Sequence, residues 1–198
     1  MDDTVRIGVA VGVPEPWGSR LDRARKEAGD PLAALIPSHV TLLGPTDIDP
    51  STLPAIEAHL AEVANQRPPF PVRLRGTGTF RPVTEVVFVA VAAGISEFEL
   101  LAAGVREGPL ERELHFPYHP HVTVAHDIPT PALDAVFERL AGFSAAFEVD
   151  HFTLYVHGAD GQWRPVRDFR WRAGEPDRPG GGGMGLGHRP LPGQVARV

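Results

Sequence analysis

The sequence of 198 residues contains no cysteine, so disulfides, thiolate metal sites and cysteine nucleophiles are excluded. No stretch approaches the roughly 18 apolar residues of a membrane span, and the first residues lack the basic segment of a signal peptide. Basic charge is also scarce. The formal net charge of −6 argues against an extended basic surface for long nucleic acid. We therefore expect a cytoplasmic protein that makes no membrane contact and holds any anionic ligand at a local cationic site.

The composition changes abruptly near Ala173. Residues 174–198 contain the run Gly180 to Gly183 and several prolines, but few large apolar side chains. Such a segment cannot bury enough surface to offset the entropy lost on ordering. The sequence therefore predicts one folded domain over residues 1–172 and a disordered Gly/Pro-rich tail over residues 173–198.

Strand-like and helix-like patterns alternate before this tail. Period-two or continuous β-branched runs predict strands at 4–11, 36–43, 70–76, 84–92, 120–125, 147–156 and 163–171. Apolar residues at helical spacing predict helices at 17–28, 49–64, 96–106 and 131–142. Gly76 and Gly78 lack the lysine and following helix of a phosphate loop, so they predict a bend or bulge. The order of these elements indicates an α+β fold.

An internal repeat connects the two halves of the chain. The triplets His39-Val40-Thr41 and His121-Val122-Thr123 differ by 82 positions, and matching Asp-Ile pairs follow both of them. The entry strands also match at an offset of 82, with Val5 to Val11 aligned to Val87 to Ala93. We expect a duplicated, bilobed fold in which two antiparallel sheets face a central cleft, with helices outside. Each lobe then contributes one triplet to the cleft.

The triplets suit the chemistry of phosphodiesters. Residues two apart on a strand point to the same face, about 6.5–7 Å apart, so His39 points with Thr41 and His121 with Thr123. One histidine can take a proton from the attacking oxygen while the other gives a proton to the leaving oxygen. The threonine hydroxyls can donate hydrogen bonds to the non-bridging phosphate oxygens. This scheme needs no metal ion and no other cofactor.

At these residues the sequence resembles the 2H phosphoesterase superfamily, which includes the 2′-5′ RNA ligase-like proteins and the cyclic nucleotide phosphodiesterases. The motifs are His39-Val40-Thr41-Leu42 and His121-Val122-Thr123-Val124, with the flanking runs Gly76 to Pro82 and Phe116 to Pro120. The resemblance spans residues 4–172. It implies that His39 and His121 are catalytic and that Thr41 and Thr123 bind phosphate.

The same resemblance implies a substrate with a 2′,3′-cyclic phosphate or a 2′-5′ linkage, with reversible 2′-5′ RNA ligation as a further activity. We expect a monomer whose partner is a nucleotide or a short RNA. One departure concerns the residues after the second motif. They read Val124-Ala125-His126 and lack the basic residue often found there in the family. Which histidine acts as acid and which as base stays open.

Four residues near the motifs are further candidates for substrate binding. Phe80 can stack on a base or belong to the core, and Arg81 can contact a phosphate or stay exposed. Tyr118 can stack on a base or cap the core. His119 can line the mouth of the cleft or face solvent.

Two other readings of the site remain. A non-catalytic module could bind a nucleotide or an RNA end in the same cleft. A metal-dependent hydrolase could use His119, His121 and His126 together with Asp127, but strand alternation predicts that His126 points away from His121. We therefore expect no metal site.

Overall fold

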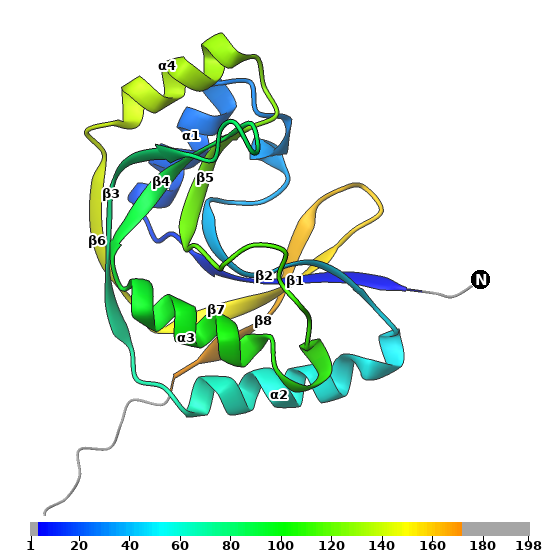
Figure 1. Cartoon of the computed structure of the whole chain (residues 1–198). Coiled ribbons are helices and arrows are strands. Elements are labelled where there is room, and N and C mark those ends of the chain that lie inside the picture. Colours follow the sequence, from blue (N-terminus) through cyan, green and yellow to red (C-terminus); the bar gives the residue numbers. More distant parts are fainter. Residues whose placement is uncertain (1–3, 172–198) are drawn as a thin grey trace, which may run out of the picture.

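The computed structural model describes residues 4–171, so the predicted tail lies outside the described part. Twelve helices and strands follow in the order β1 (Val5–Gly12), α1 (Trp17–Glu27), β2 (His39–Ile48), α2 (Leu53–Asn65), β3 (Phe70–Thr79), β4 (Val86–Ala93), α3 (Ile95–Val105), β5 (His121–His126), α4 (Thr130–Leu140), β6 (Ser144–Val149), β7 (His151–His157) and β8 (Trp163–Arg170) (Figure 1). The α+β class predicted from the sequence is confirmed. No helix of the described part is long and apolar enough to cross a membrane.

All eight strands belong to one antiparallel sheet in the order β6-β3-β4-β5-β2-β1-β7-β8. The two separate facing sheets expected from the repeat are therefore wrong in detail. The middle residues of the two motifs, Val40 on β2 and Val122 on β5, pair with each other and join the halves. The sheet bends sharply across this short pairing, and Figure 1 shows β3, β4 and β6 running steeply across β1, β2, β7 and β8.

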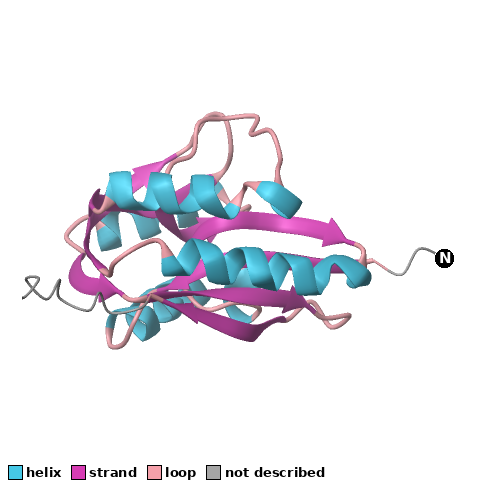
Figure 2. Cartoon of the chain, turned by 90° about the horizontal axis from the view of Figure 1, so that it is seen from below, coloured by secondary structure: helices cyan, strands magenta, loops and turns pink. Residues whose placement is uncertain are grey.

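The helices pack in pairs on the two halves of the sheet. Helices α1 and α4 contact β5, and α4 also contacts β3 and β4, whereas α3 contacts β2 and α2 contacts β8. Figure 2, turned by 90°, shows helices on more than one side of the strands. The strand residues under the helices are fully buried in one core that includes Val40, Leu42, Val122 and Val124. The motif histidines and threonines alternate with these residues and so face the other way.

The two motif strands pair with their entry strands in the same register. On β1, Gly12 pairs with His39 and Ala10 with Thr41, and on β4 the corresponding pairs are Ala90 with His121 and Phe88 with Thr123. The entry strands are thus offset by 78 positions, from Ala10 to Phe88, rather than the 82 inferred from the sequence. The difference arises because the chain between entry strand and motif is four residues longer in the second half.

Each motif strand also carries a bulge directly after its threonine. Leu42 and Leu43 are both buried, as are Val124 and Ala125, where simple alternation requires one of each pair to face the cleft. The register shifts at these points, so two residues of the motif strand oppose one residue of the entry strand. The predicted bend at Gly76 is a bulge as well, because Gly76 has a φ of 67° and the β3–β4 register shifts there.

Two strands occupy the segment predicted as a single strand at 147–156. β6 pairs with β3 in one half of the sheet, and β7 pairs with β1 in the other half. Asp150 lies between the two strands. Both strands are half-buried, so the hydrophobic pattern on the two sides of Asp150 looks like that of one strand. The pattern therefore did not indicate that the segment changes its partner strand. β6 consequently lies beside β3 in the same half of the sheet.

Candidate active site

In both motifs the imidazole Nδ1 lies within hydrogen-bonding distance of the carbonyl oxygen two residues earlier. His39 Nδ1 is 2.8 Å from the oxygen of Pro37, and His121 Nδ1 is 2.7 Å from the oxygen of His119. A carbonyl oxygen only accepts hydrogen bonds, so Nδ1 carries the proton in each ring. Nε2 is therefore the nitrogen available for proton transfer in both histidines.

The pairing of the two motifs sets which side chains are neighbours. In antiparallel strands the residues that flank a facing pair are opposed in crossed order, with Cα atoms about 4.5–5.5 Å apart. Thr41 therefore lies across from His121, and His39 lies across from Thr123. The sequence had suggested only the partner two residues along the same strand.

The pKa of both imidazoles is below the ordinary value of a histidine. Burial is the largest cause for His39 and for His121, and the hydrogen bonds to the backbone carbonyls oppose it. Arg25 and His121 further lower the pKa of His39, whereas Asp22 raises it. A positive charge on His121 disfavours a proton on His39, and His119 acts in the same way on His121. The lowered pKa favours the uncharged form of both rings at neutral pH.

Two cavities meet along strand β2 at the first motif. The larger has a volume of about 600 Å³ and includes His121 in its wall, and the smaller has about 110 Å³ and includes His39. Four residues line both cavities: Thr41, Leu43, Gly44 and Pro45. The larger volume is typical of pockets for small organic ligands. Thr41 thus stands at the junction, with one imidazole on each side.

The bulge in β2 turns two backbone carbonyls toward the loop before β5. The Tyr118 hydroxyl donates to the carbonyl oxygen of Thr41 at 2.8 Å, and Arg106 donates to that of Leu42 at 3.0 Å. The Arg106 guanidinium also lies over the Tyr118 ring, 4.9 Å from its centre. A bulge leaves ladder groups unpaired, and these two side chains satisfy them. Tyr118 therefore connects the segment before the second motif to β2, the strand that carries the first motif.

We expect Tyr118→Phe to lower the free energy of unfolding by about 1–2 kcal/mol, because the half-buried Thr41 carbonyl loses its donor. Turnover should fall more than substrate affinity, since the position of Thr41 changes while the cavity wall stays in place. Urea denaturation and steady-state kinetics measure the two effects. An unchanged urea midpoint together with unchanged turnover would contradict this role.

Phe80 and His119 both line the larger cavity, as expected of substrate-binding candidates. The Phe80 ring packs edge-on against His121, with centres 4.9 Å apart, and it packs at a tilt against Phe88, with centres 4.6 Å apart. The His119 ring stacks on His121 at 6.1 Å. Phe80 therefore serves as both cavity wall and support for the imidazole. Thr123 is half-buried on the same face, but it lies outside the linings of the two cavities described.

Arg81 is turned away from both cavities. Its guanidinium forms an ion pair with Asp134 of α4 at 2.8 Å and lies 3.3 Å from the Thr79 hydroxyl. Helix α4 packs against β3 and β4, so its first turns offer an acidic partner that the sequence did not reveal. In this arrangement Arg81 connects α4 to the end of β3.

Several supporting residues were not identified from the sequence. Asp22 accepts hydrogen bonds from the backbone and hydroxyl of Ser38, directly before the first motif. Arg25 donates to the carbonyl of Ile36 and pairs with Asp30 at 3.2 Å, both side chains being almost fully buried. Buried ion pairs are costly to break, so this network fixes the entry to His39. In the sequence these residues read only as the polar face of a helix and its following turn.

Gly78 is required for the packing behind His121. A Cβ atom at this position would lie 2.5 Å from the ring of Phe88, whose centre is 5.2 Å from that of His121. Any larger residue at position 78 would displace this ring. On the other side of the site, Tyr155 and Trp163 line the smaller cavity with His39. They come from β7 and β8, which no sequence motif connects to the triplets.

His126 lies on the same face of the sheet as His121, contrary to the expectation from simple alternation. The bulge at Val124 reverses the alternation, and His126 pairs with Val86 across the strand. Its ring is 3.2 Å from the carboxylate of Asp127. Within residues 4–171, no three His, Asp or Glu side chains are grouped so that they could hold a metal ion.

The family follows from comparison of the sequence with known proteins. A model of the 2′-5′ RNA ligase superfamily matches residues 13–161, which include both motifs and most of the sheet. The chain belongs to this superfamily. The resemblance to the 2H phosphoesterases, inferred from the two motifs, is thereby confirmed.

Relatives of this superfamily member align over most of its length. A protein of Oceanobacillus iheyensis, named provisionally as a phosphoesterase, is 27% identical over 167 residues, covering 83% of this chain and 97% of its own. A similarly named protein of Bacillus mycoides is 29% identical, covering 83% and 96%. Among solved structures, E. coli LigT has a TM-score of 0.62 at 22% identity, covering 85% of this chain and 98% of LigT. TT0787 of Thermus thermophilus has a TM-score of 0.59 at 24% identity, covering 86% and 99%.

Proposed function

We propose that this chain is a metal-independent phosphodiesterase that acts on a 2′,3′-cyclic phosphate or a 2′-5′ linked nucleotide or RNA end. His39 and His121 are its catalytic acid–base pair. The main support is that Nδ1 of each ring is hydrogen-bonded to a backbone carbonyl, which leaves Nε2 available in both. His39 and His121 line different cavities, and Thr41 lines both of them. Thr41 and Thr123 then hold the phosphate oxygens.

The reaction on a cyclic phosphate requires two proton transfers on opposite sides of phosphorus. One imidazole takes a proton from water as the water oxygen attacks, and the bond from phosphorus to one ribose oxygen breaks. The other imidazole, protonated at Nε2, gives its proton to that ribose oxygen. An anionic phosphate between the rings raises the low pKa of both and so favours the protonated acid. After the reaction the first imidazole has gained a proton and the second has lost one. The starting state returns when the first loses its proton and the second regains one.

The wall of the larger cavity favours an anionic nucleotide. The larger cavity is lined by Arg106, Arg112 and His115 and has no acidic residue in its described wall. LigT of E. coli has been solved with 3′-AMP, with NADP+ and with ATP, and it shares the fold of this chain. The same residues make reversible 2′-5′ ligation chemically available, because transfer to a ribose hydroxyl uses the same acid and base.

The matching registers of the two halves support an origin by internal duplication. Entry strand, motif strand and bulge have the same pairing in both halves. A duplication also explains why the Nδ1–H group of each histidine donates to the carbonyl oxygen two residues earlier. We infer that the two motifs began as copies of one unit.

The test is hydrolysis of nucleoside 2′,3′-cyclic phosphates and of 2′-5′ linked dinucleotides by the full chain in the presence of a strong chelator. We expect turnover that the chelator does not change. Turnover that is lost with chelator and restored by one divalent ion would overturn the metal-independent mechanism. Tight binding of these compounds without turnover would favour a non-catalytic module in the same cleft.

A further inference from the structure

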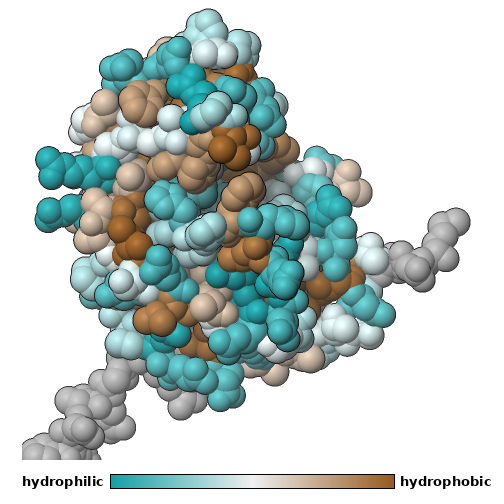
Figure 3. All heavy atoms as spheres, viewed as in Figure 1, coloured by the Kyte–Doolittle hydropathy of each residue, from teal (hydrophilic) through white to brown (hydrophobic). Residues whose placement is uncertain are grey.

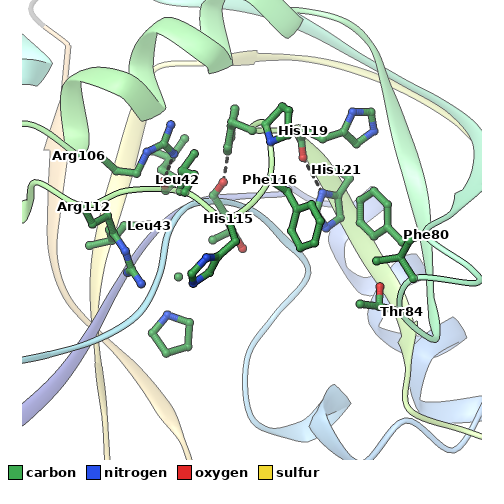
Figure 4. A pocket seen from close by; sticks show the side chains of 17 residues that line it. Leu42, Leu43, Phe80, Thr84, Arg106, Arg112, His115, Phe116, His119 and His121 are labelled. Atoms are coloured by element: carbon green, nitrogen blue, oxygen red, sulfur yellow. Dashed lines mark hydrogen bonds between the residues drawn. The ribbon is translucent and has the colours of Figure 1, made fainter.

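The larger cavity continues well beyond the reacting histidine. Figure 4 shows His121 and Phe80 at one end and Arg106 and Arg112 at the other, with His115 and Phe116 between them. A single phosphate bound at the junction would leave the distant end of this 600 Å³ space unused. The distant end is also where the cationic side chains gather.

The position of the distant end follows from the contact of Arg112 with β2. Arg112 donates to the Thr46 hydroxyl at 2.6 Å, and Thr46 lies five residues beyond Thr41 on β2. At about 3.3 Å per residue this separation is at most roughly 16 Å, and the bulge after Thr41 shortens it. Arg112 is thus held beside a part of β2 beyond the motif, and Figure 4 shows it at the opposite end of the cavity from His121.

The two arginines at the distant end differ in their contacts. Arg106 is committed to the Leu42 carbonyl and the Tyr118 ring, and its pKa is lowered by burial. Arg112 is exposed and, within the described part, uses one N–H group on Thr46 and has no carboxylate partner. A guanidinium has five donors in a planar fork, so Arg112 keeps donors for an anion. His115 lines the cavity beside it.

An exposed aromatic ring lies between the two ends. Phe116 is 69% exposed although it lines the cavity, and Leu114 beside it is 46% exposed. Apolar side chains reach the surface only in small separate patches on the face seen in Figure 3. Aromatic rings in such positions act as platforms for nucleic-acid bases, because each stacked base contributes substantially to binding.

We propose that Arg112 and His115 form a second phosphate site for a short oligonucleotide whose terminal phosphate reacts at the histidines, with Phe116 stacking a base between the two phosphates. The proposal rests on the proposed function, which places a 2′,3′-cyclic phosphate at the junction. In such a substrate both ring hydroxyls are occupied by the reacting phosphate. The chain can therefore continue only through the 5′ oxygen, and the second phosphate lies on the 5′ side.

The experiment compares mono-, di- and trinucleotides that end in the same 2′,3′-cyclic phosphate and begin with a 5′ hydroxyl. The readout is the length preference, defined as kcat/KM for the trinucleotide divided by kcat/KM for the mononucleotide. We expect a preference of about tenfold or more, as for a charge-assisted hydrogen-bonded contact. It should fall to about one in Arg112→Gln and decrease in His115→Gln. Arg73→Gln, which removes an exposed arginine on β3 outside the cavity, should keep the full preference.

A second measurement separates this proposal from the proposed function. Binding of 3′-phosphorylated mono- and trinucleotides to the full chain needs no turnover. Tighter binding of the trinucleotide that depends on Arg112 supports the second site even where no substrate is hydrolysed. Equal kcat/KM and equal affinity for the two lengths overturn it, and so does a preference that Arg112→Gln leaves intact.

Discussion

Replacing either motif histidine by asparagine should reduce kcat/KM on a 2′,3′-cyclic nucleotide by about 10³-fold, within the 10²–10⁴-fold range of general acid–base catalysis. Asparagine retains a side-chain N–H that can donate to the carbonyl of Pro37 or His119. It has no group that exchanges a proton near neutral pH. The substitution therefore removes the chemistry and preserves the local contact of the folded chain. Steady-state kinetics on His39→Asn, His121→Asn and the double variant measure the loss.

The double variant distinguishes a cooperating pair from two independent contributions. The effects of substituting groups that act in one proton-transfer cycle are strongly non-additive. The kcat/KM of the double variant should therefore be little lower than that of the less active single variant. His151→Ala serves as the control, since His151 lies on β7 beside Asp150 and outside both cavities. Losses below tenfold in both single variants, with native urea unfolding, would show that these histidines are not the acid–base pair.

The sequence contained enough information for the class and most elements of the fold. Four helices and the motif strands follow from apolar periodicity, because each element buries one face against a common core. The number of sheets could not be predicted from the sequence. Whether β2 and β5 join depends on one backbone pairing at Val40 and Val122, and two valines flanked by His and Thr look the same in a joined or an open arrangement.

The candidate site was predictable in its central residues and not in its walls. His39, Thr41 and His121 stand in short motifs, and strand alternation gives their common direction. The bulges could not be predicted, because Leu42 and Leu43 read as an ordinary apolar pair until the register of β1 is known. The contacts of Tyr118 and Arg106 with the carbonyls at the bulge were hidden for the same reason.

The loop before β5 was the least predictable part of the site. Arg112, His115 and Phe116 lie in a segment without periodicity, where neither spacing nor charge indicates a cavity wall. The ion pair of Arg81 with Asp134 joins residues 53 positions apart, and it likewise depends on how α4 packs. Local patterns therefore predicted the motif residues of the candidate site, whereas long-range packing determined the shape of the cavities around them.

Replacing the motif threonines by valine should lower kcat by about 10²-fold for each position, as for removal of one donor from a site that stabilises developing negative charge. Valine keeps the branched shape, so the strands and the cavity wall remain. The crossed register makes a finer prediction possible. Thr41 lies across from His121 and Thr123 across from His39, so Thr41→Val should perturb the pKa of His121 more than that of His39. NMR titration of the imidazole resonances measures this difference.

Thr130→Val is the matched control, because Thr130 is exposed at the start of α4 and away from both cavities. It should leave kcat and both imidazole titrations unchanged. The effect of Thr123→Val is the more informative of the two, since Thr123 lies outside the described cavity walls and reaches the phosphate only if the substrate settles between the strands. A normal kcat in Thr123→Val, beside a strongly reduced kcat in Thr41→Val, would mean that one hydroxyl alone holds the phosphate and that the two halves have diverged in function.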